Sequence, residues 1–129
     1  MRTASALLIS LSLLAAACGR PSHVPGAVAP RRPNAYELQL GKEVYQTYCL
    51  GCHGLTGAGD GFNAFNLDPR PRDLADPALQ KSKSNVDLAD AIRRGGAGVG
   101  LTSLMPPWGH TIDERHINAV VLYIRSLRR

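Results

Sequence analysis

The sequence predicts an all-α protein, a small bundle of three to five helices. Apolar residues recur at spacings of three and four in residues 34–48 and 111–129, and a shorter stretch of this kind follows Ser84. The segments between these stretches are rich in Gly, Asn, Asp and Pro, and they show no sustained period. A chain of 129 residues with this pattern holds one domain, which we place at residues 34–129.

The N-terminus predicts export from the cytoplasm. Arg2 precedes an apolar run over residues 4–17, which is short for a membrane span but suits a secretory signal peptide. We therefore expect residues 1–17 to be a signal peptide. We expect this leader and the linker that follows it to be disordered.

The residues around Cys18 resemble the lipobox of bacterial lipoproteins. Small residues precede Cys18, although Leu14 stands four positions before it, where the usual pattern has three. The resemblance implies that Cys18 is diacylated and anchors the protein to a membrane. Ordinary signal cleavage and an uncleaved anchor stay open as alternatives. Residues 18–33 carry four of the nine prolines, which predicts an extended, semi-rigid linker.

The first predicted helix begins at a capping box formed by Asn34 and Glu37. It continues with residues at spacings of three and four, namely Leu38, Gly41, Tyr45 and Tyr48. A glycine inside a helix costs about 1 kcal/mol relative to alanine, so Gly41 indicates that another backbone crosses the helix there.

This helix leads into Cys49, Cys52 and His53, which form the C-x-x-C-H pattern of a haem attachment site. Residues three and four apart share one face of a helical turn, so two thiols and an imidazole can face one planar ligand. The thiols suit thioether bonds to the haem vinyl groups, and His53 would bind the iron through one ring nitrogen. The sequence therefore predicts one covalent haem c.

A redox dithiol and half of a zinc site are the competing interpretations of this motif. A dithiol of that kind follows a strand, whereas the residues before Cys49 have a helical pattern. Zinc requires further Cys or His ligands, and the remaining cysteine, Cys18, lies far away in the leader. We therefore favour haem over both.

We expect residues 54–74 to form a loop, because this segment is rich in Gly, Asn, Asp and Pro. Ser84 or Asn85 can then cap a short helix that ends at Gly95 and Gly96. A second loop contains Met105, which is the only methionine besides the initiator.

The last predicted helix begins at a second capping box, formed by Thr111 and Glu114. It carries an apolar stripe with a period near 3.6, made of Ile117, Val120, Val121, Ile124 and Leu127. We expect the first and last helices to cross at Gly41, with Tyr45 and Tyr123 flanking the contact. The closing Arg125, Arg128 and Arg129 suit the C-terminus of this helix.

The charge distribution excludes nucleic acid as a partner. The net charge is +5, but all ten acidic residues lie at Glu37 or later, alongside eleven basic residues. The predicted domain is therefore nearly neutral, with no dense basic stripe and no interleaved aromatics.

Taken together, residues 34–129 resemble the class I c-type cytochromes, and are most similar to the monohaem bacterial type that occurs free, as a lipoprotein or as a subunit of respiratory complexes. The resemblance rests on Gly41 and Tyr45 ahead of the C-x-x-C-H motif, an irregular middle, a loop with Met105 and Pro106, and a terminal helix. Further matches are Gly54, Gly57, Gly59, Asp60 and Gly61 after the motif, and residues 69–74. The resemblance implies a cytochrome c-like bundle wrapped around one covalent haem.

The resemblance also implies the iron ligands, with His53 on the proximal side and Met105 on the distal side. Met105 as an ordinary core residue, with the sixth position open or taken by His110, stays open as an alternative. Relatives usually have proline in place of Phe62, near the carbonyl that accepts a hydrogen bond from the His53 ring. A carbonyl does not require proline, so we expect this hydrogen bond to survive.

Two further residues are candidates for binding the haem propionates. Trp108 can donate its indole N–H to a propionate or pack as a core aromatic. Arg72 can pair with a propionate or remain a solvated charge. The residues leave both pairs of alternatives open.

The function that these residues imply is that of a single-electron carrier, not an enzyme. A thioether ligand favours ferrous iron, and two protein ligands leave the iron no open position. Its partners would be a complex that oxidises quinol or another reductant, and a terminal oxidase or reductase. We expect it on the periplasmic side of a bacterial membrane. If Met105 is labile, the alternative is a haem-based ligand sensor or a weak peroxidase.

Overall fold

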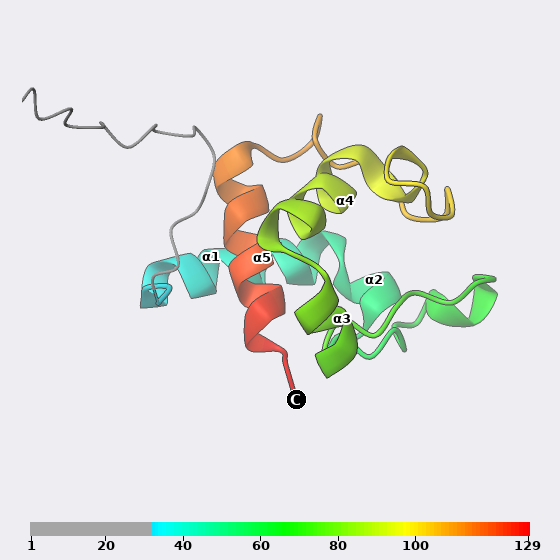
Figure 1. The fold of residues 1–129 in the computed structure, drawn as a ribbon, viewed down its shortest axis with the longest axis horizontal. Coiled ribbons are helices and arrows are strands. Elements are labelled where there is room, and N and C mark those ends of the chain that lie inside the picture. The colour runs from blue at the N-terminus through cyan, green and yellow to red at the C-terminus, as the bar shows by residue number, and fades with distance from the viewer. Residues whose placement is uncertain (1–31) are drawn as a thin grey trace, which may run out of the picture.

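The computed structural model describes residues 32–129, so the predictions for the signal peptide, for Cys18 and for nearly all of the linker lie outside the described residues. Residues 32–129 form five α-helices and one short 3₁₀-helix (Figure 1). In chain order these are α1 (Ala35–Tyr48), α2 (Leu50–His53), η1 (Ala64–Asn66), α3 (Pro77–Ser82), α4 (Asn85–Gly98) and α5 (Glu114–Ser126). The prediction of a small all-α bundle is confirmed.

The first and last helices, α1 and α5, cross at Gly41 (Figure 1). A Cβ atom at Gly41 would lie 2.1 Å from the Ala119 carbonyl oxygen, so only glycine lets the two backbones approach this closely. Beside the crossing, the rings of Tyr45 and Tyr123 pack with their centroids 5.2 Å apart and their planes tilted by 55°. The predicted crossing, with both tyrosines next to it, is confirmed.

The hydrophobic core forms around this crossing, where α4 and the segment before α5 add their apolar side chains. Burial of this apolar surface provides the main driving force for folding. The buried cluster consists of Val44, Tyr45, Leu88, Ala89, Ile92, Ile112, Ile117, Val120, Val121 and Ile124.

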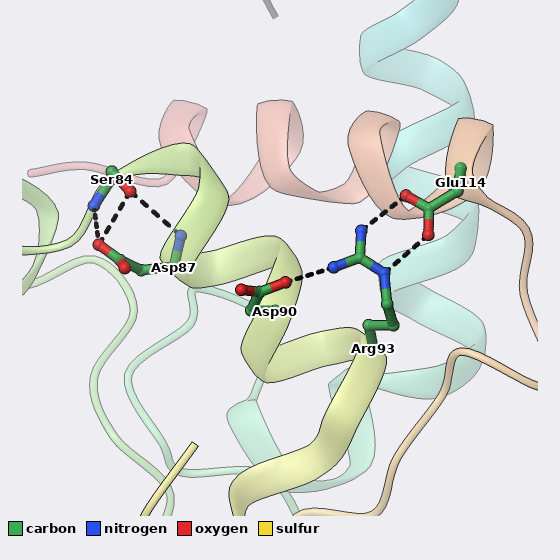
Figure 2. A network of polar contacts seen from close by, with 5 residues as sticks. All are labelled: Ser84, Asp87, Asp90, Arg93 and Glu114. Atoms are coloured by element: carbon green, nitrogen blue, oxygen red, sulfur yellow. Dashed lines mark hydrogen bonds and ion pairs between the residues drawn. The ribbon is translucent and has the colours of Figure 1, made fainter. Parts of the chain in front are cut away.

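The capping signals of α1 and α4 are confirmed, and that of α5 is wrong. Asn34 and Glu37 form the predicted capping box at α1, and Ser84 caps α4 together with Asp87 (Figure 2). The N-cap of α5 is Asp113, not Thr111, and its carboxylate accepts a hydrogen bond from the His116 N–H at 2.9 Å.

The start of α5 is also held by α4. The Arg93 guanidinium donates two hydrogen bonds of 2.7 Å to the Glu114 carboxylate, and it also pairs with Asp90 (Figure 2). Glu114 therefore cannot serve the capping box that the sequence predicts with Thr111. Because the Arg93 and Glu114 side chains are 35% and 62% exposed, this ion pair contributes little stability by itself.

α3 was not expected, although Asp76 and Pro77 form a helix start signal. Asp76 caps the helix by accepting a hydrogen bond from the Ala78 N–H at 2.9 Å, and Pro77 occupies the first turn. α3 is held in place by the buried Gln80, whose side chain donates to the carbonyls of Leu74 and Ile124 at 2.6 and 2.9 Å.

Arg125 joins three helices and does not serve only the C-terminus of its own helix. Its guanidinium donates to the carbonyls of Gln80 and Lys83 and to the side chain of Asn85. It thereby links α5 to the end of α3 and to the start of α4. Burial lowers the pKa of Arg125, since a half-buried guanidinium loses part of its hydration. These three acceptors stabilise its positive charge in place of water.

α4 breaks at Gly95, as its glycine pair predicts. Gly95 has a φ of 69°, which is outside the helical region, and one further helical turn follows it up to Gly98. Within residues 32–129, none of the helices combines the length and the apolar character that crossing a membrane requires.

The crossing at Gly41 can be tested by the variant Gly41→Ala. Although alanine is the better helix former, the new Cβ would overlap the backbone of Ala119, so we expect the free energy of unfolding to fall by about 1–3 kcal/mol. Chemical denaturation measures this change. The control is Lys42→Ala at the exposed neighbouring position, which should change the stability by less than about 0.5 kcal/mol. A Gly41→Ala variant as stable as the wild type would contradict the close crossing.

Candidate haem-binding site

The C-x-x-C-H motif lies where α1 ends and α2 begins. Cys49 joins the two helices, and the His53 N–H donates to the Cys49 carbonyl at 2.9 Å, which is a helical hydrogen bond. The motif therefore forms one helical turn, as its spacing predicts. Both cysteines are half-buried free thiols.

The electrostatics of Cys49 do not suit a reactive dithiol. Burial, and secondarily the neighbouring Cys52, raises the pKa of Cys49 to about 12. A redox-active cysteine has a lowered pKa because the thiolate is the attacking species. Cys49 is instead held as a neutral thiol at the edge of an apolar core.

The His53 ring is oriented by a backbone carbonyl. Its Nδ1 atom lies 3.2 Å from the carbonyl oxygen of Arg72. Because a carbonyl can only accept, this hydrogen bond requires the proton on Nδ1, and the neutral ring then keeps the lone pair of Nε2 for a metal. Burial lowers the pKa of His53, which also favours the neutral ring, although the Arg72 contact acts in the opposite direction.

The expectation that this carbonyl lies near Phe62 is wrong. The acceptor belongs to Arg72, ten residues further along the chain, whereas the Phe62 side chain is 77% exposed beside Gly51. The substitution of proline by phenylalanine at position 62 therefore leaves the hydrogen bond of His53 in place.

The glycine-rich loop after the motif folds back onto α2. Its backbone amides donate to the carbonyls of the last three motif residues: Asn63 to Gly51 at 2.8 Å, Gly61 to Cys52 at 3.2 Å and Gly59 to His53 at 2.9 Å. These are carbonyls that the end of a helix leaves without an internal partner. The loop therefore fixes the backbone of the last three motif residues.

Gly59 also brings the Arg72 carbonyl to His53. Gly59 has a φ of 77°, a conformation that favours glycine. A Cβ atom at this position would also lie 2.2 Å from the carbonyl oxygen of Pro71. Leu74 anchors the same segment by donating its N–H to the Gly57 carbonyl at 2.7 Å. The glycines that follow the motif therefore position the hydrogen-bond acceptor of the histidine.

Tyr45 is a contributor to this site that the sequence did not reveal. Its buried hydroxyl donates to the carbonyl of Gly54, the residue after His53, at 2.8 Å. Burial raises the pKa of Tyr45, so the hydroxyl remains a donor. The core residue beside the helix crossing is thus tied directly to the end of the motif.

Cys49, Met105 and Trp108 each lie at the border of the same apolar core. All three are half-buried and pack against the buried cluster, together with Tyr48, Leu50 and Leu74. The Trp108 ring packs on Tyr48, with centroids 5.2 Å apart, so the methionine loop contacts the residue just before the motif. In Figure 1 this loop (yellow to orange) and the loop after α2 (green) project to the same side of the molecule.

Arg72 and Trp108 differ in what they can offer to a ligand. The Arg72 side chain is exposed, and the structure assigns its role in the site to the backbone carbonyl. The indole N–H of Trp108 has no hydrogen-bond partner within residues 32–129 and is therefore available to a propionate.

These groups fit haem c and do not fit a bare metal ion. Free thiols, an imidazole with a fixed tautomer and a thioether at the border of one apolar core are the donors that haem c requires. No cluster of three or more His, Cys, Asp or Glu side chains suited to a metal ion is found in the described part of the chain.

The helical fold and the C-x-x-C-H turn define a monohaem class I c-type cytochrome, a class that binds haem c covalently and transfers electrons. Residues 37–124 match the family model described as cytochrome c oxidase, cbb3-type, subunit III, and the chain belongs to this family. Family membership confirms the predicted haem c and excludes the zinc and dithiol interpretations of the motif.

Two curated relatives are FixP subunits of cbb3-type cytochrome c oxidases. The chain is 28% identical over 92 residues to that of Bradyrhizobium diazoefficiens, and 27% identical over 92 residues to that of Bradyrhizobium sp. strain ORS 278. Each match covers 71% of this chain but 28% of the relative, so the chain spans little more than a quarter of their length.

Solved structures confirm the fold. The c-type cytochrome KustC0563 has a TM-score of 0.53 and 24% identity, covering 69% of this chain and 98% of its own. The reducing HAO-like protein complex Kustc0457/Kustc0458 of Kuenenia stuttgartiensis has a TM-score of 0.63 and 23% identity, covering 78% of this chain and 47% of its own.

The role of the Tyr45 hydroxyl can be tested by the variant Tyr45→Phe. Because it leaves the Gly54 carbonyl without its donor, we expect the free energy of unfolding to fall by about 0.5–1.5 kcal/mol. The matched control is Tyr123→Phe, since the Tyr123 hydroxyl has no hydrogen-bond partner within residues 32–129. Equal losses of stability in the two variants, measured by denaturation, would argue against this hydrogen bond.

Proposed function

We propose that this protein carries single electrons in a bacterial respiratory chain through one haem c, held by thioether bonds at Cys49 and Cys52, with His53 and Met105 as the iron ligands. The observation that carries this proposal is the hydrogen bond between His53 Nδ1 and the Arg72 carbonyl. It presents Nε2 as a fixed, unprotonated ligand on a turn that also holds both thiols.

Met105 is the proposed ligand on the opposite side of the iron. It lies at the border of the core with Cys49 and Trp108, in a loop that is hydrogen-bonded to α4. The bound haem supplies an iron that changes its charge by one electron. A thioether favours the ferrous form, and apolar surroundings disfavour the extra charge of the ferric form, so this ligand pair supports a comparatively high reduction potential.

We further propose that the protein is a carrier and not an enzyme. With His53 and Met105 both bound, the iron would have no free coordination position for a substrate. The alternative, a ligand sensor or a weak peroxidase, requires that Met105 leaves the iron readily. The ligand-binding experiment described below distinguishes the two.

The proposed partners are a terminal oxidase or reductase and a complex that oxidises quinol or another reductant. The family membership and the two FixP relatives, which are oxidase subunits, support an oxidase as the electron acceptor. The protein would act either as a free carrier or as a fixed subunit. Co-purification with an oxidase in detergent would support the second form.

We propose a location on the periplasmic side of a membrane. The signal peptide assigned to residues 1–17 would direct export, and acylation of Cys18 with a proline-rich linker over residues 18–33 would tether the cytochrome domain, residues 34–129, to the bilayer. Arg72 and Trp108 are proposed to contact the haem propionates, Trp108 through its available indole N–H.

Ligation by Met105 is tested by the variant Met105→Ala. The oxidised wild-type protein should show the absorption band of sulfur-to-iron charge transfer, and the reduced protein should bind carbon monoxide only slowly. The variant should lose the band, bind carbon monoxide rapidly and have a lower reduction potential. Leu104→Ala is the control, because it truncates the exposed neighbouring side chain and should change none of these properties. A Met105→Ala variant with unchanged potential and ligand exclusion would rule out Met105 as the ligand.

The membrane anchor is tested separately by the variant Cys18→Ser. Without its acylation site, the mature protein should move from the membrane fraction to the soluble periplasmic fraction while retaining its haem spectrum. Immunoblotting of salt-washed membranes measures the distribution. If a variant whose mass shows that residues 1–17 have been removed stays in the membrane fraction, the lipid anchor at Cys18 is wrong.

A further inference from the structure

The end of α4 and the methionine loop are joined by backbone hydrogen bonds. The Gly96 N–H donates to the Met105 carbonyl at 2.9 Å, and the N–H groups of Trp108 and Gly109 donate to the carbonyls of Ile92 and Arg93 at 2.9 and 3.0 Å. Because α4 breaks at Gly95, these two carbonyls lack partners within the helix. The loop therefore supplies the hydrogen bonds that the broken helix needs.

The contact is too close for any side chain at either glycine. A Cβ atom at Gly95, where φ is 69°, would lie 2.7 Å from the Pro107 nitrogen and 2.8 Å from the Met105 carbonyl oxygen. A Cβ atom at Gly96 would lie 2.0 Å from the Thr102 carbonyl oxygen. The neighbouring atoms belong to the backbone, which cannot rotate away as the end of a long side chain can.

The two prolines after Met105 make the docked segment stiff. A residue that precedes proline is restricted to extended conformations, so both Met105 and Pro106 have little backbone freedom. Neither Pro106 nor Pro107 has an N–H group, so neither can donate to α4. The position of Met105 therefore depends on its own carbonyl, on the Trp108 and Gly109 amides and on the space at the glycines.

The ion pair between Arg93 and Glu114 bridges the same segment but cannot replace this docking. It connects α4 to the start of α5, beyond the loop (Figure 2). Since Glu114 is largely exposed, water and salt screen the interaction. We therefore assign the position of the methionine loop to the backbone contact at Gly95 and Gly96.

We propose that Gly95 and Gly96 are positioning residues for Met105. Because these two glycines have no side chains, the backbone of residues 102–107 can dock on α4 and hold the thioether at the haem. This inference rests on the proposed ligation by Met105. The stability of the iron–sulfur bond would then depend on the backbone contact between the methionine loop and the two glycines of α4. Opening of that contact and dissociation of Met105 are then one event.

The test uses the full chain with its haem attached and the variants Gly95→Ala and Gly96→Ala. Forcing a methyl group into such a contact should raise the open population by roughly 5- to 150-fold. Both variants should therefore weaken the charge-transfer band and bind carbon monoxide faster by a factor in that range. Gly100→Ala is the matched control, because Gly100 also has a positive φ, 75°, but nothing lies within 4 Å of its Cβ position. It should keep the wild-type spectrum and ligand exclusion.

A second measurement needs no variant. When carbon monoxide displaces Met105 in the reduced wild-type protein, hydrogen exchange at the Gly96 and Trp108 amides should accelerate, because these amides bond across the docked contact. Unchanged protection would show that the side chain leaves while the backbone stays docked, and would overturn the inference.

The outcomes separate this inference from the function on which it rests. If the wild type shows no charge-transfer band, Met105 is not the ligand, and both proposals fail. If the wild type shows the band and both variants keep it and bind carbon monoxide no faster than the wild type, only the positioning role is overturned. Equal changes in the band and in carbon monoxide binding in all three glycine variants would also overturn it. Backbone strain, without any close contact, would then explain the changes.

Discussion

The structure depends on the close approach of α1 and α5 at Gly41. With no Cβ at this position, the two helix backbones come close enough for the Tyr45 ring to pack on Tyr123 in the space beside the crossing. This places the Tyr45 hydroxyl under the end of α2, where it bonds to the Gly54 carbonyl. A steric condition in the middle of α1 thus determines the position of the haem motif one turn beyond Tyr45.

On both sides of the proposed haem, backbone contacts at glycines hold the segments that carry its ligands. On the histidine side, Gly59 admits the Pro71 carbonyl, and the next carbonyl, that of Arg72, orients His53. On the methionine side, Gly95 and Gly96 admit the backbone around Met105. An electron carrier benefits from such rigidity, because iron ligands that move little keep the reorganisation on electron transfer small. The core itself contains few aromatic residues, so a buried porphyrin would add much apolar surface to it.

The sequence predicted the features that depend on short-range patterns. The C-x-x-C-H turn, the cap at Asn34 and the break at Gly95 follow from residues a few positions apart, and the crossing at Gly41 follows from a glycine in one helical pattern and the apolar stripe of another. It did not reveal the Arg72 carbonyl, because any residue supplies a carbonyl and only the fold selects one. It also misplaced the cap of α5, since Thr111 and Asp113 are both good caps and the choice depends on Arg93, 21 residues before Glu114. Gln80 and Arg125, which unite three helices, were missed for the same reason.

The account rests on one porphyrin bound covalently at Cys49 and Cys52. The most direct test is the intact mass of the mature protein, followed by the mass of the peptide that contains residues 49–53. The account predicts that the protein and this peptide each carry the added mass of one haem, with no free thiol in the motif. A colourless protein whose peptide shows two free thiols or a disulfide would contradict it.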